Sequence, residues 1–450
     1  MSINLNITPG STSTGSGIDV TSVVNQILDA DRAPERLWQT QQATLTVQST
    51  AWTGISTTLT SLQSKVNNLK DVFGAITAMT AVSSQPAILT ATAGTSAASG
   101  NHVVVVNGLA TTSSYYTDPV TSSSTPFGTG TLSLQLGNGT PVDIPVDETN
   151  NTLDSLASYI NGAALGVTAS VINDANGARL ALVSRTTGLP GDLTITGDVG
   201  LTFNKVAGKN ASLSVDGVPV SSASNTVSTV LPGVTLNLVT ASEGTEVQLA
   251  VGPDVTRAKQ AVNDFVSAYN AVIGAVNSEF TVNSSTNTAG PLAADGSLRS
   301  LQASLLSDVT YSVAGNNGIT GLASIGVNMN DDGSLTVDDT KLTDVLTSKF
   351  SNFQNFFQSA GPAGFANHFG TDLYALTDPS SGLISLSQSE ISSTQKMLTQ
   401  QINDFEDRLA VTQKQLIDQY SRVDTMLRQF PMIMAQITSQ LGALQQGQGQ

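Results

Sequence analysis

The stretch from Asn328 to Asp339, NMNDDGSLTVDD, has the residue types and spacing of a calcium-binding loop. Side-chain oxygens stand at its first, third and fifth positions, glycine at the sixth and a carboxylate at the twelfth, as in an EF-hand. An EF-hand also needs a helix on each side, but the preceding GLASIGV contains two glycines and no helical apolar pattern. Asp339 is one methylene shorter than the usual bidentate glutamate. We therefore predict a short hairpin that turns at residues 330–333 and leads into a helix capped by Asp338 or Asp339.

The remaining candidates for chemistry are weaker still. His102 and His368 are far apart in the chain, and neither has a second His or Cys at ligand spacing, so both are expected to be ordinary polar side chains. The sequence has no cysteine, no GxSxG, no Walker A loop and no GxGxxG followed by an acidic residue. We predict no catalytic residue, no metal site and no cofactor.

Composition narrows the classes of partner. The 450 residues suggest about three domains. The net charge of −16, with only 18 Lys and Arg residues, argues against nucleic acid and anionic membranes. The first 17 residues are rich in Ser, Thr and Gly; they predict a mobile arm and lack the basic and apolar regions of a cleaved signal peptide. No apolar run is long enough to span a bilayer.

Both ends of the chain have helical periodicity. A helix is expected from Ile18, capped by Asp19 or Thr21 and interrupted by Pro34. Two heptad runs follow, each a narrow stripe that needs a partner helix, within its own subunit or in a neighbour. The first comprises Leu45, Gln48, Trp52, Ile55, Leu59, Leu62, Val66, Leu69, Phe73 and Ile76; the second comprises Leu398, Ile402, Phe405, Leu409, Thr412, Leu416, Tyr420, Val423, Leu427, Phe430, Met434, Ile437, Leu441 and Leu444.

Two irregularities mark the second run. Two successive four-residue steps between Thr412 and Tyr420 form a stutter that unwinds a left-handed supercoil locally. Pro431 lacks an N–H and predicts a kink or a break, and the glutamine-rich last residues should fray.

The middle of the chain has β character. Residues 132–136 and 142–146 alternate around Gly137-Asn138-Gly139, and residues 167–172 and 178–184 flank a second turn, so two hairpins are expected. Residues 152–160 predict a helix capped by Thr152. Further strands are expected at 102–106, 212–215, 235–239 and 246–251. A helix returns at Val255, with apolar positions at Ala258, Val262, Phe265, Tyr269, Val272 and Val276.

Five stretches are distinctive: GIDVTSVVNQILDADRAPERL (17–37), VDGVPVSSASNTVSTVLPGVTLNL (215–238), AVNDFVSAYNAVI (261–273), GPLAADGSLRSLQ (290–302) and GLASIGVNMNDDGSLTVDDTKLTDVL (321–346). They resemble flagellar hook-associated protein 2, the bacterial filament-cap family. Residues 131–184 resemble the insertion motif of flagellins and hook-associated proteins. The order of the stretches also matches the family, and Pro431 is a departure from it.

The expected fold is a multidomain α+β chain, with long terminal helices forming a coiled-coil-like stem and two inserted, mainly β domains. Its predicted domains are a helical, partly disordered leg (1–39 and 401–450), a helical domain with a small hairpin (40–78 and 254–400), a β domain (79–120 and 204–253) and a second, inserted β domain (121–203).

The resemblance implies an extracellular structural cap at the distal tip of the flagellum, exported without a cleaved signal. It implies a ring of about five or six copies that retains flagellin and promotes its folding and insertion, with hook–filament junction proteins and an export chaperone as further partners. The positions selected for packing between subunits or against the filament are Val23, Ile27, Leu409, Leu416, Tyr420, Val423, Leu427, Ile437 and Leu441.

Other functions remain open at this point. A surface adhesin would bind host glycans through residues 79–253, independently of the helices. A secreted hydrolase on a helical stalk would need a nucleophile and base, and the sequence offers no such pair. Flagellin and the hook–filament junction proteins are the nearest alternatives of the same class, and the cap-like stretches at 17–37 and 290–346 favour the cap.

Overall fold

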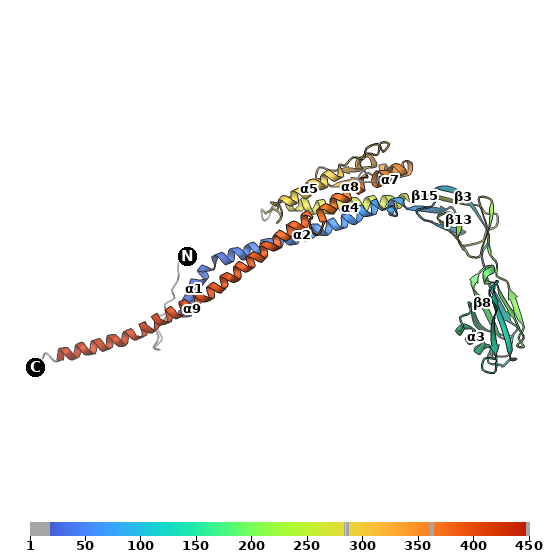
Figure 1. Cartoon of the computed structure of the whole chain (residues 1–450), viewed down its shortest axis with the longest axis horizontal. Coiled ribbons are helices and arrows are strands. Elements are labelled where there is room, and N and C mark those ends of the chain that lie inside the picture. Colours follow the sequence, from blue (N-terminus) through green and yellow to red (C-terminus); the bar gives the residue numbers. More distant parts are fainter. Residues whose placement is uncertain (1–18, 283, 285–287, 360–363, 447–450) are drawn as a thin grey trace. The chain divides into compact units, whose positions relative to one another are not determined.

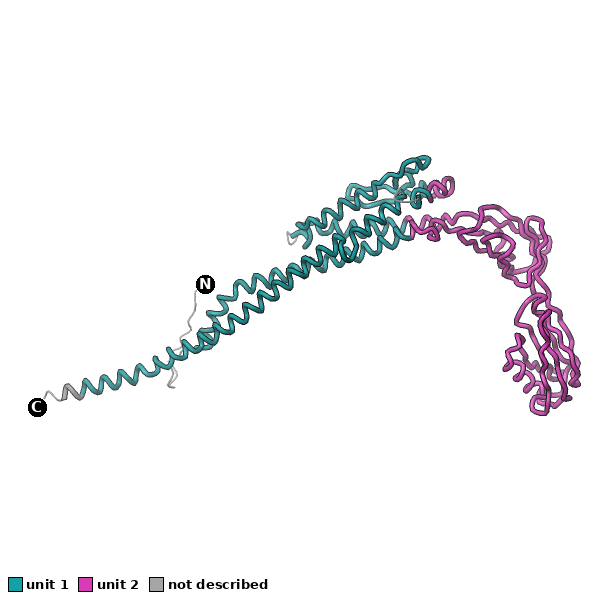
Figure 2. Tube along the Cα trace, in the orientation of Figure 1, with its two compact units in different colours: residues 1–67, 263–342, 355–450 teal, residues 68–262, 343–354 magenta. Residues whose placement is uncertain are grey.

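The computed structural model describes residues 19–282, 284, 288–359 and 364–446, and their side chains as far as 442 (Figure 1). The chain divides into two compact units (Figure 2). The first contains residues 1–67, 263–342 and 355–450, and the second contains residues 68–262 and 343–354. Long helices at both ends and β-sheets between them confirm the predicted fold class. The expected mobile arm and the last four residues lie outside the described residues.

The helices are long at the chain ends and shorter between them. They are α1 (Val20–Asp31), α2 (Ala33–Lys70), α3 (Leu153–Gly162), α4 (Val255–Phe280), α5 (Gly296–Val309), α6 (Asp339–Ser348), α7 (Phe350–Gln358), α8 (Phe365–Thr377) and α9 (Leu383–Gln446). Within the described residues, no helix is both long and apolar enough to cross a membrane.

Local sequence signals set the start of the first two helices. The Asp19 carboxylate accepts hydrogen bonds from the backbone N–H groups of Thr21 and Ser22, so Asp19 is the predicted N-cap of α1. Pro34 is the second residue of α2, where its missing N–H costs nothing. The heptad of α2 is buried from Trp52 to Leu69, as its spacing predicts.

The heptad prediction was wrong at Phe73. This side chain is 75% exposed, because α2 ends at Lys70 and the apolar spacing continues past the end of the helix.

The exposed face of α2 obtains its polarity from threonine rather than from charge. Residues 37–64 contain no charged side chain. Threonine hydroxyls along this stretch donate to carbonyls four residues earlier, at 2.8–3.0 Å; the donors are Thr40, Thr44, Thr46, Thr50, Thr53, Thr57 and Thr60. Each hydroxyl is therefore satisfied within the helix that carries it.

An aromatic cluster forms much of the core of the first unit. The Phe265 ring on α4 lies 5.8 Å from that of Phe365 and 5.6 Å from that of Phe369 on α8, both edge to face. Phe356 stacks on Phe365 at 5.2 Å. All four side chains are fully buried. Rings at these separations add specific contacts to the burial of apolar area, and so fix how α4 and α8 pack.

The calcium-like stretch forms the predicted hairpin. Strands β16 (Val327–Met329) and β17 (Leu335–Val337) pair antiparallel around a turn in which Gly333 has φ +81°. The Asp332 carboxylate accepts from the N–H and hydroxyl of Ser334 at 2.9 and 2.6 Å, and the hydroxyl contact, followed by the N–H contact, lowers the pKa of Asp332. Asp338 caps α6 by accepting from the N–H groups of Thr340 and Lys341. Turn chemistry thus accounts for the acidic residues.

The second unit contains four antiparallel sheets. In order across each sheet, they are β1 (Met79–Ser83), β15 (Val247–Pro253), β3 (Gly100–Gly108), β11 (Ala211–Val215) and β12 (Val218–Ser222); then β13 (Thr226–Leu231), β14 (Val234–Leu238) and β2 (Leu89–Ala93); then β10 (Phe203–Val206), β4 (Thr112–Thr117), β8 (Gly177–Thr187) and β7 (Val167–Asp174); and finally β6 (Val142–Val146), β5 (Gly130–Leu136) and β9 (Leu193–Thr196).

These sheets bury two separate apolar clusters. One, within residues 115–203, includes Leu180 and the buried face of α3; the other, within residues 79–251, includes Leu213 and Val104. The two predicted hairpins are confirmed as β5–β6 and β7–β8. Thr152 caps α3 in a capping box with Ser155, as its sequence predicts.

Candidate oligomerisation surface

The N-terminal helix packs on the C-terminal helix in a small apolar cluster. Val24 and Leu28 of α1 and Leu409 of α9 are its buried members, with exposed fractions of 0, 6 and 7%. Half-buried residues surround them: Val20, Phe405, Leu416, Ile417 and Tyr420. On the α2 side, the Trp38 ring meets that of Phe405 edge to face at 5.5 Å. The cluster joins the two ends of the chain within one subunit.

A charged clamp borders this cluster. Both terminal nitrogens of Arg32, at the junction of α1 and α2, donate to the Glu406 carboxylate of α9 at 2.6 and 3.1 Å. Arg32 also donates to Glu35 at 2.6 Å. The hydrogen bond from Arg32 lowers the pKa of Glu406, and the same bond raises that of Arg32. A planar guanidinium that grips a carboxylate with two nitrogens fixes orientation as well as distance.

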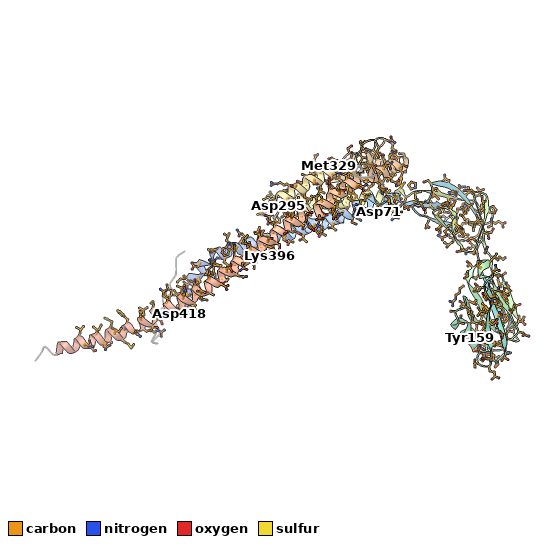
Figure 3. The ribbon with its side chains drawn as sticks, viewed as in Figure 1. Asp71, Tyr159, Asp295, Met329, Lys396 and Asp418 are labelled. Carbon is orange, nitrogen blue, oxygen red and sulfur yellow. The ribbon has the colours of Figure 1, made fainter. Side chains whose placement is uncertain are left out.

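Beyond Tyr420, α9 carries an apolar stripe that no described residue covers. We call Val423, Leu427, Phe430, Met434, Ile437 and Leu441 the C-terminal stripe; their steps of four and three residues place them along one helix face. Each is between 43 and 62% exposed. Met426 and Ile433, which are 68 and 50% exposed, lie beside the stripe and widen it, whereas Met432, 67% exposed, lies on the opposite side of the helix. Figure 3 shows these last turns of α9, past the labelled Asp418, with side chains projecting freely.

The nine positions predicted for packing between subunits differ in how far their side chains are buried within the single chain. Leu409 is buried against α1, and Leu416 and Tyr420 are half-buried beside it. Val23 and Ile27 are also half-buried, whereas the neighbouring Val24 and Leu28 face α9. The remaining four, Val423, Leu427, Ile437 and Leu441, are exposed members of the C-terminal stripe.

Sequence reasoning missed part of this surface. Phe430 and Met434 belong to the predicted heptad but were not selected as site residues, although the spacing pointed to them. The clamp of Arg32 and Glu406 was also missed, because nothing in the sequence links residues so distant in the chain. The side chain of Leu444 lies outside the described residues.

The prediction at Pro431 was a kink or a break, and the break is absent: α9 continues through this residue. Proline leaves the carbonyl of Leu427 without its intrahelical donor and strains the preceding turn. Every described residue from 425 to 442 is exposed, so water can reach this part of the helix. A solvated helix tolerates the lost bond better than a buried one, since the free carbonyl is not desolvated.

Comparisons with protein-family models match both the N-terminal and the C-terminal part of the chain. Residues 16–113 match the family model described as "Flagellar hook-associated protein 2 N-terminus", and residues 208–431 match the model of the same protein's C-terminus. The chain belongs to the flagellar hook-associated protein 2 family. Residues 131–186 match the "Flagellin hook IN motif", which confirms the predicted insertion motif.

Individual relatives support this membership along nearly the whole chain. The chain is 29% identical to the B-type flagellar hook-associated protein 2 of Pseudomonas aeruginosa, over 96% of this chain and 97% of the relative. It is 28% identical to the flagellar hook-associated protein 2 of Escherichia coli K12, over 95% of this chain and 96% of that one.

A solved structure gives the same result. The D1-D2-D3 domains of the flagellar cap protein FliD from Escherichia coli align at a TM-score of 0.62 and 28% identity, covering 76% of this chain and 99% of that one. The flagellar hook-associated protein 2 family consists of structural flagellar cap proteins and is not a known enzyme family. Membership implies a place at the tip of the extracellular flagellum and a part in motility. The adhesin alternative has no support from these relatives.

Proposed function

We propose that copies of this chain assemble at the distal tip of the flagellar filament through the C-terminal stripe, forming a cap that retains exported flagellin and promotes its folding and insertion. The observation that carries the proposal is the stripe itself: six apolar side chains at heptad spacing, all at least 43% exposed in the single chain. Exposure of such a stripe to water costs free energy, and packing against a second amphipathic helix with the same spacing removes that cost.

The energy of this contact suits a cap that must move as subunits are added. Burying one half-exposed leucine or methionine contributes about 1 kcal/mol, so a seam of this length contributes several before the entropy of association is subtracted. A contact of this strength keeps two copies together and still allows them to separate when a flagellin subunit is added. The chain also lacks cysteine and has 12% charged residues, which favours unfolded passage through a narrow export channel without cross-linking.

Four features are predicted from the family resemblance alone: the number of subunits, the contacts with flagellin, the junction proteins as partners and the export chaperone. The leg, helical and two β domains also remain a prediction, since the two compact units do not separate all four.

The test compares two double variants with equal added charge. Leu427→Glu with Met434→Glu places two carboxylates in the stripe, seven residues apart. Gln429→Glu with Gln436→Glu places two carboxylates outside it, also seven residues apart. All four side chains are exposed, so neither variant disturbs the buried core. Each variant replaces the native chain in its own bacterium, and filament length and flagellin released into the medium are measured; purified oligomers are counted by electron microscopy.

We expect the stripe variant to be folded and monomeric, to lose flagellin to the medium and to give short or absent filaments, while the control variant behaves as the native chain. Normal filaments from the stripe variant would overturn the proposal. If the stripe variant still forms oligomers but the bacteria lose their filaments, the stripe contacts flagellin and not a second copy of the chain. That result would refute assembly through the stripe.

A further inference from the structure

Three side chains that the oligomerisation surface does not use converge in the first unit. Asp308 lies one residue before the end of α5, and His368 and Asp372 lie one turn apart on α8. Ligand-type atoms of all three lie within 4.8 Å of one another. The sequence shows the four-residue spacing of His368 and Asp372, but only packing of α5 on α8 brings Asp308 to them.

The distances from the imidazole to the two carboxylates are too long for hydrogen bonds. His368 Nε2 lies 3.7 Å from Asp308 Oδ1 and 3.6 Å from Asp372 Oδ2. A tetrahedral shell with bonds of about 2.1 Å has ligand-to-ligand edges of roughly 3.4 Å. The two distances from the imidazole are within a few tenths of an ångström of such an edge, and the two carboxylate oxygens lie within 4.8 Å of each other.

The buried member of the cluster has one carboxylate oxygen without a hydrogen-bond partner. The Asp308 side chain is 2% exposed, and its Oδ2 has no hydrogen-bond donor. In the described part of the chain, His368 is the only Lys, Arg or His side chain within 4.0 Å of the Asp308 or Asp372 carboxylate. An ionised carboxylate buried in such a place costs free energy, and either a proton or a bound cation removes that cost.

The remaining geometry favours entry and binding. The His368 ring stacks on Tyr311 with centroids 3.9 Å apart, which fixes the ring plane. His368 and Asp372 are 30 and 39% exposed, so an ion can enter from solvent. One imidazole and two carboxylates match the ligand preferences of Zn²⁺ and its first-row neighbours, whereas Ca²⁺ and Mg²⁺ take oxygen ligands. Two carboxylates also balance a divalent charge.

We propose that Asp308, His368 and Asp372 bind one divalent first-row transition-metal ion, of which Zn²⁺ is the probe of choice, and that the ion ties α5 to α8. Three protein ligands leave one position for water. The site is distinct from the C-terminal stripe, and the two proposals can fail separately.

The experiment titrates ZnCl₂ into the untagged full-length chain after treatment with a chelator, by calorimetry and by thermal melting. The native chain should bind one ion and melt at a higher temperature when loaded. His368→Gln should abolish this binding. Asp372→Asn, a half-exposed position that should not affect folding, should weaken it at least about 10-fold. His102→Gln removes the other histidine, which pairs with Asp216 at 2.7 Å in the second unit, and should bind as the native chain does.

Metal-free melting of each variant controls for folding, and Co²⁺ absorption provides a second readout of ligand number. The site is refuted if the native chain binds no Zn²⁺ or Co²⁺. It is equally refuted if His368→Gln and Asp372→Asn bind as the native chain does, or if His102→Gln loses the binding. Competition by millimolar Mg²⁺ or Ca²⁺ would contradict the proposed ligand chemistry.

Discussion

At the scale of the residue, the contact of α1 with α9 depends on one arginine. The 2.6 Å and 3.1 Å bonds from Arg32 to Glu406 are the charged part of this contact, which also contains an apolar cluster and a hydrogen bond from Gln413 to Asn25 at 3.2 Å. The Glu406 carboxylate has its pKa lowered by this arginine, so it favours the folded state only while it is ionised.

The first prediction concerns acid sensitivity. Because the pKa of Glu406 is lower in the folded chain, its contribution is complete above its ordinary pKa and is lost as pH falls through the folded value. Glu406→Gln should therefore lower the melting temperature near pH 7, and its difference from the native chain should shrink as pH falls below the ordinary glutamate pKa of about 4.3. Asp407→Asn removes the same charge one residue away, at an exposed position, and should change little. A constant difference between native chain and Glu406→Gln across pH 3–7 would contradict this role.

Residue roles that depend on near neighbours in the chain were predictable from the sequence, and roles that depend on tertiary packing were not. The caps at Asp19, Thr152 and Asp338 were predictable because each serves N–H groups two or three positions away. The cluster of His368 with Asp308 was not, since only tertiary packing relates two helices. The first helix is an intermediate case: helical spacing indicates an apolar stripe, but only the position of α9 decides that Val24 and Leu28 are buried.

At the scale of the element, boundaries follow local chemistry where it is strong. The capping box on α3 pairs the Thr152 hydroxyl with the Ser155 N–H at 3.2 Å and the Ser155 hydroxyl with the Thr152 N–H at 3.1 Å. Where no such signal exists, apolar spacing extends predictions too far, as at Phe73 beyond the end of α2. At Pro431 the helix continues on both sides, so of the predicted kink or break the break is excluded.

The α3 cap gives a prediction for this element alone. Thr152→Ala removes the acceptor for the Ser155 N–H and should destabilise α3 by about 1 kcal/mol. Thr152→Ser keeps the hydroxyl and should be nearly neutral. Hydrogen exchange of the α3 amides in the full-length chain measures the local free energy of opening. Equal exchange in all three proteins would show that packing, and not the cap, sets the stability of this helix.

At the scale of the whole molecule, some apolar clusters are buried and others are exposed. The two β clusters supply buried cores, whereas the C-terminal stripe leaves apolar surface exposed. The alternation and turn residues of the hairpins made the β region predictable from sequence. Which strands share a sheet was not predictable, because β1 pairs with β15 and β3 with β11 across most of the region.

Core damage and assembly should therefore be separable. Leu180→Ala opens a cavity at a fully buried position in one β cluster and should cost about 2–5 kcal/mol in that cluster. Val183→Ala, on the same strand but 37% exposed, should cost much less. Calorimetry should show one shifted transition, with oligomers still present below it. Loss of oligomers in Leu180→Ala at temperatures where the chain remains folded would contradict this separation.

The threonine-clad face of α2 has a consequence for the medium around the molecule. Dissolved salt screens charges and has little effect on short hydrogen bonds made within a helix. Residues 37–64 carry no charge, and their exposed hydroxyls are already bonded to their own backbone. This stretch of helix therefore keeps its stability as ionic strength rises or falls, which suits a protein of the flagellum, where the cell does not control the composition of the surrounding water.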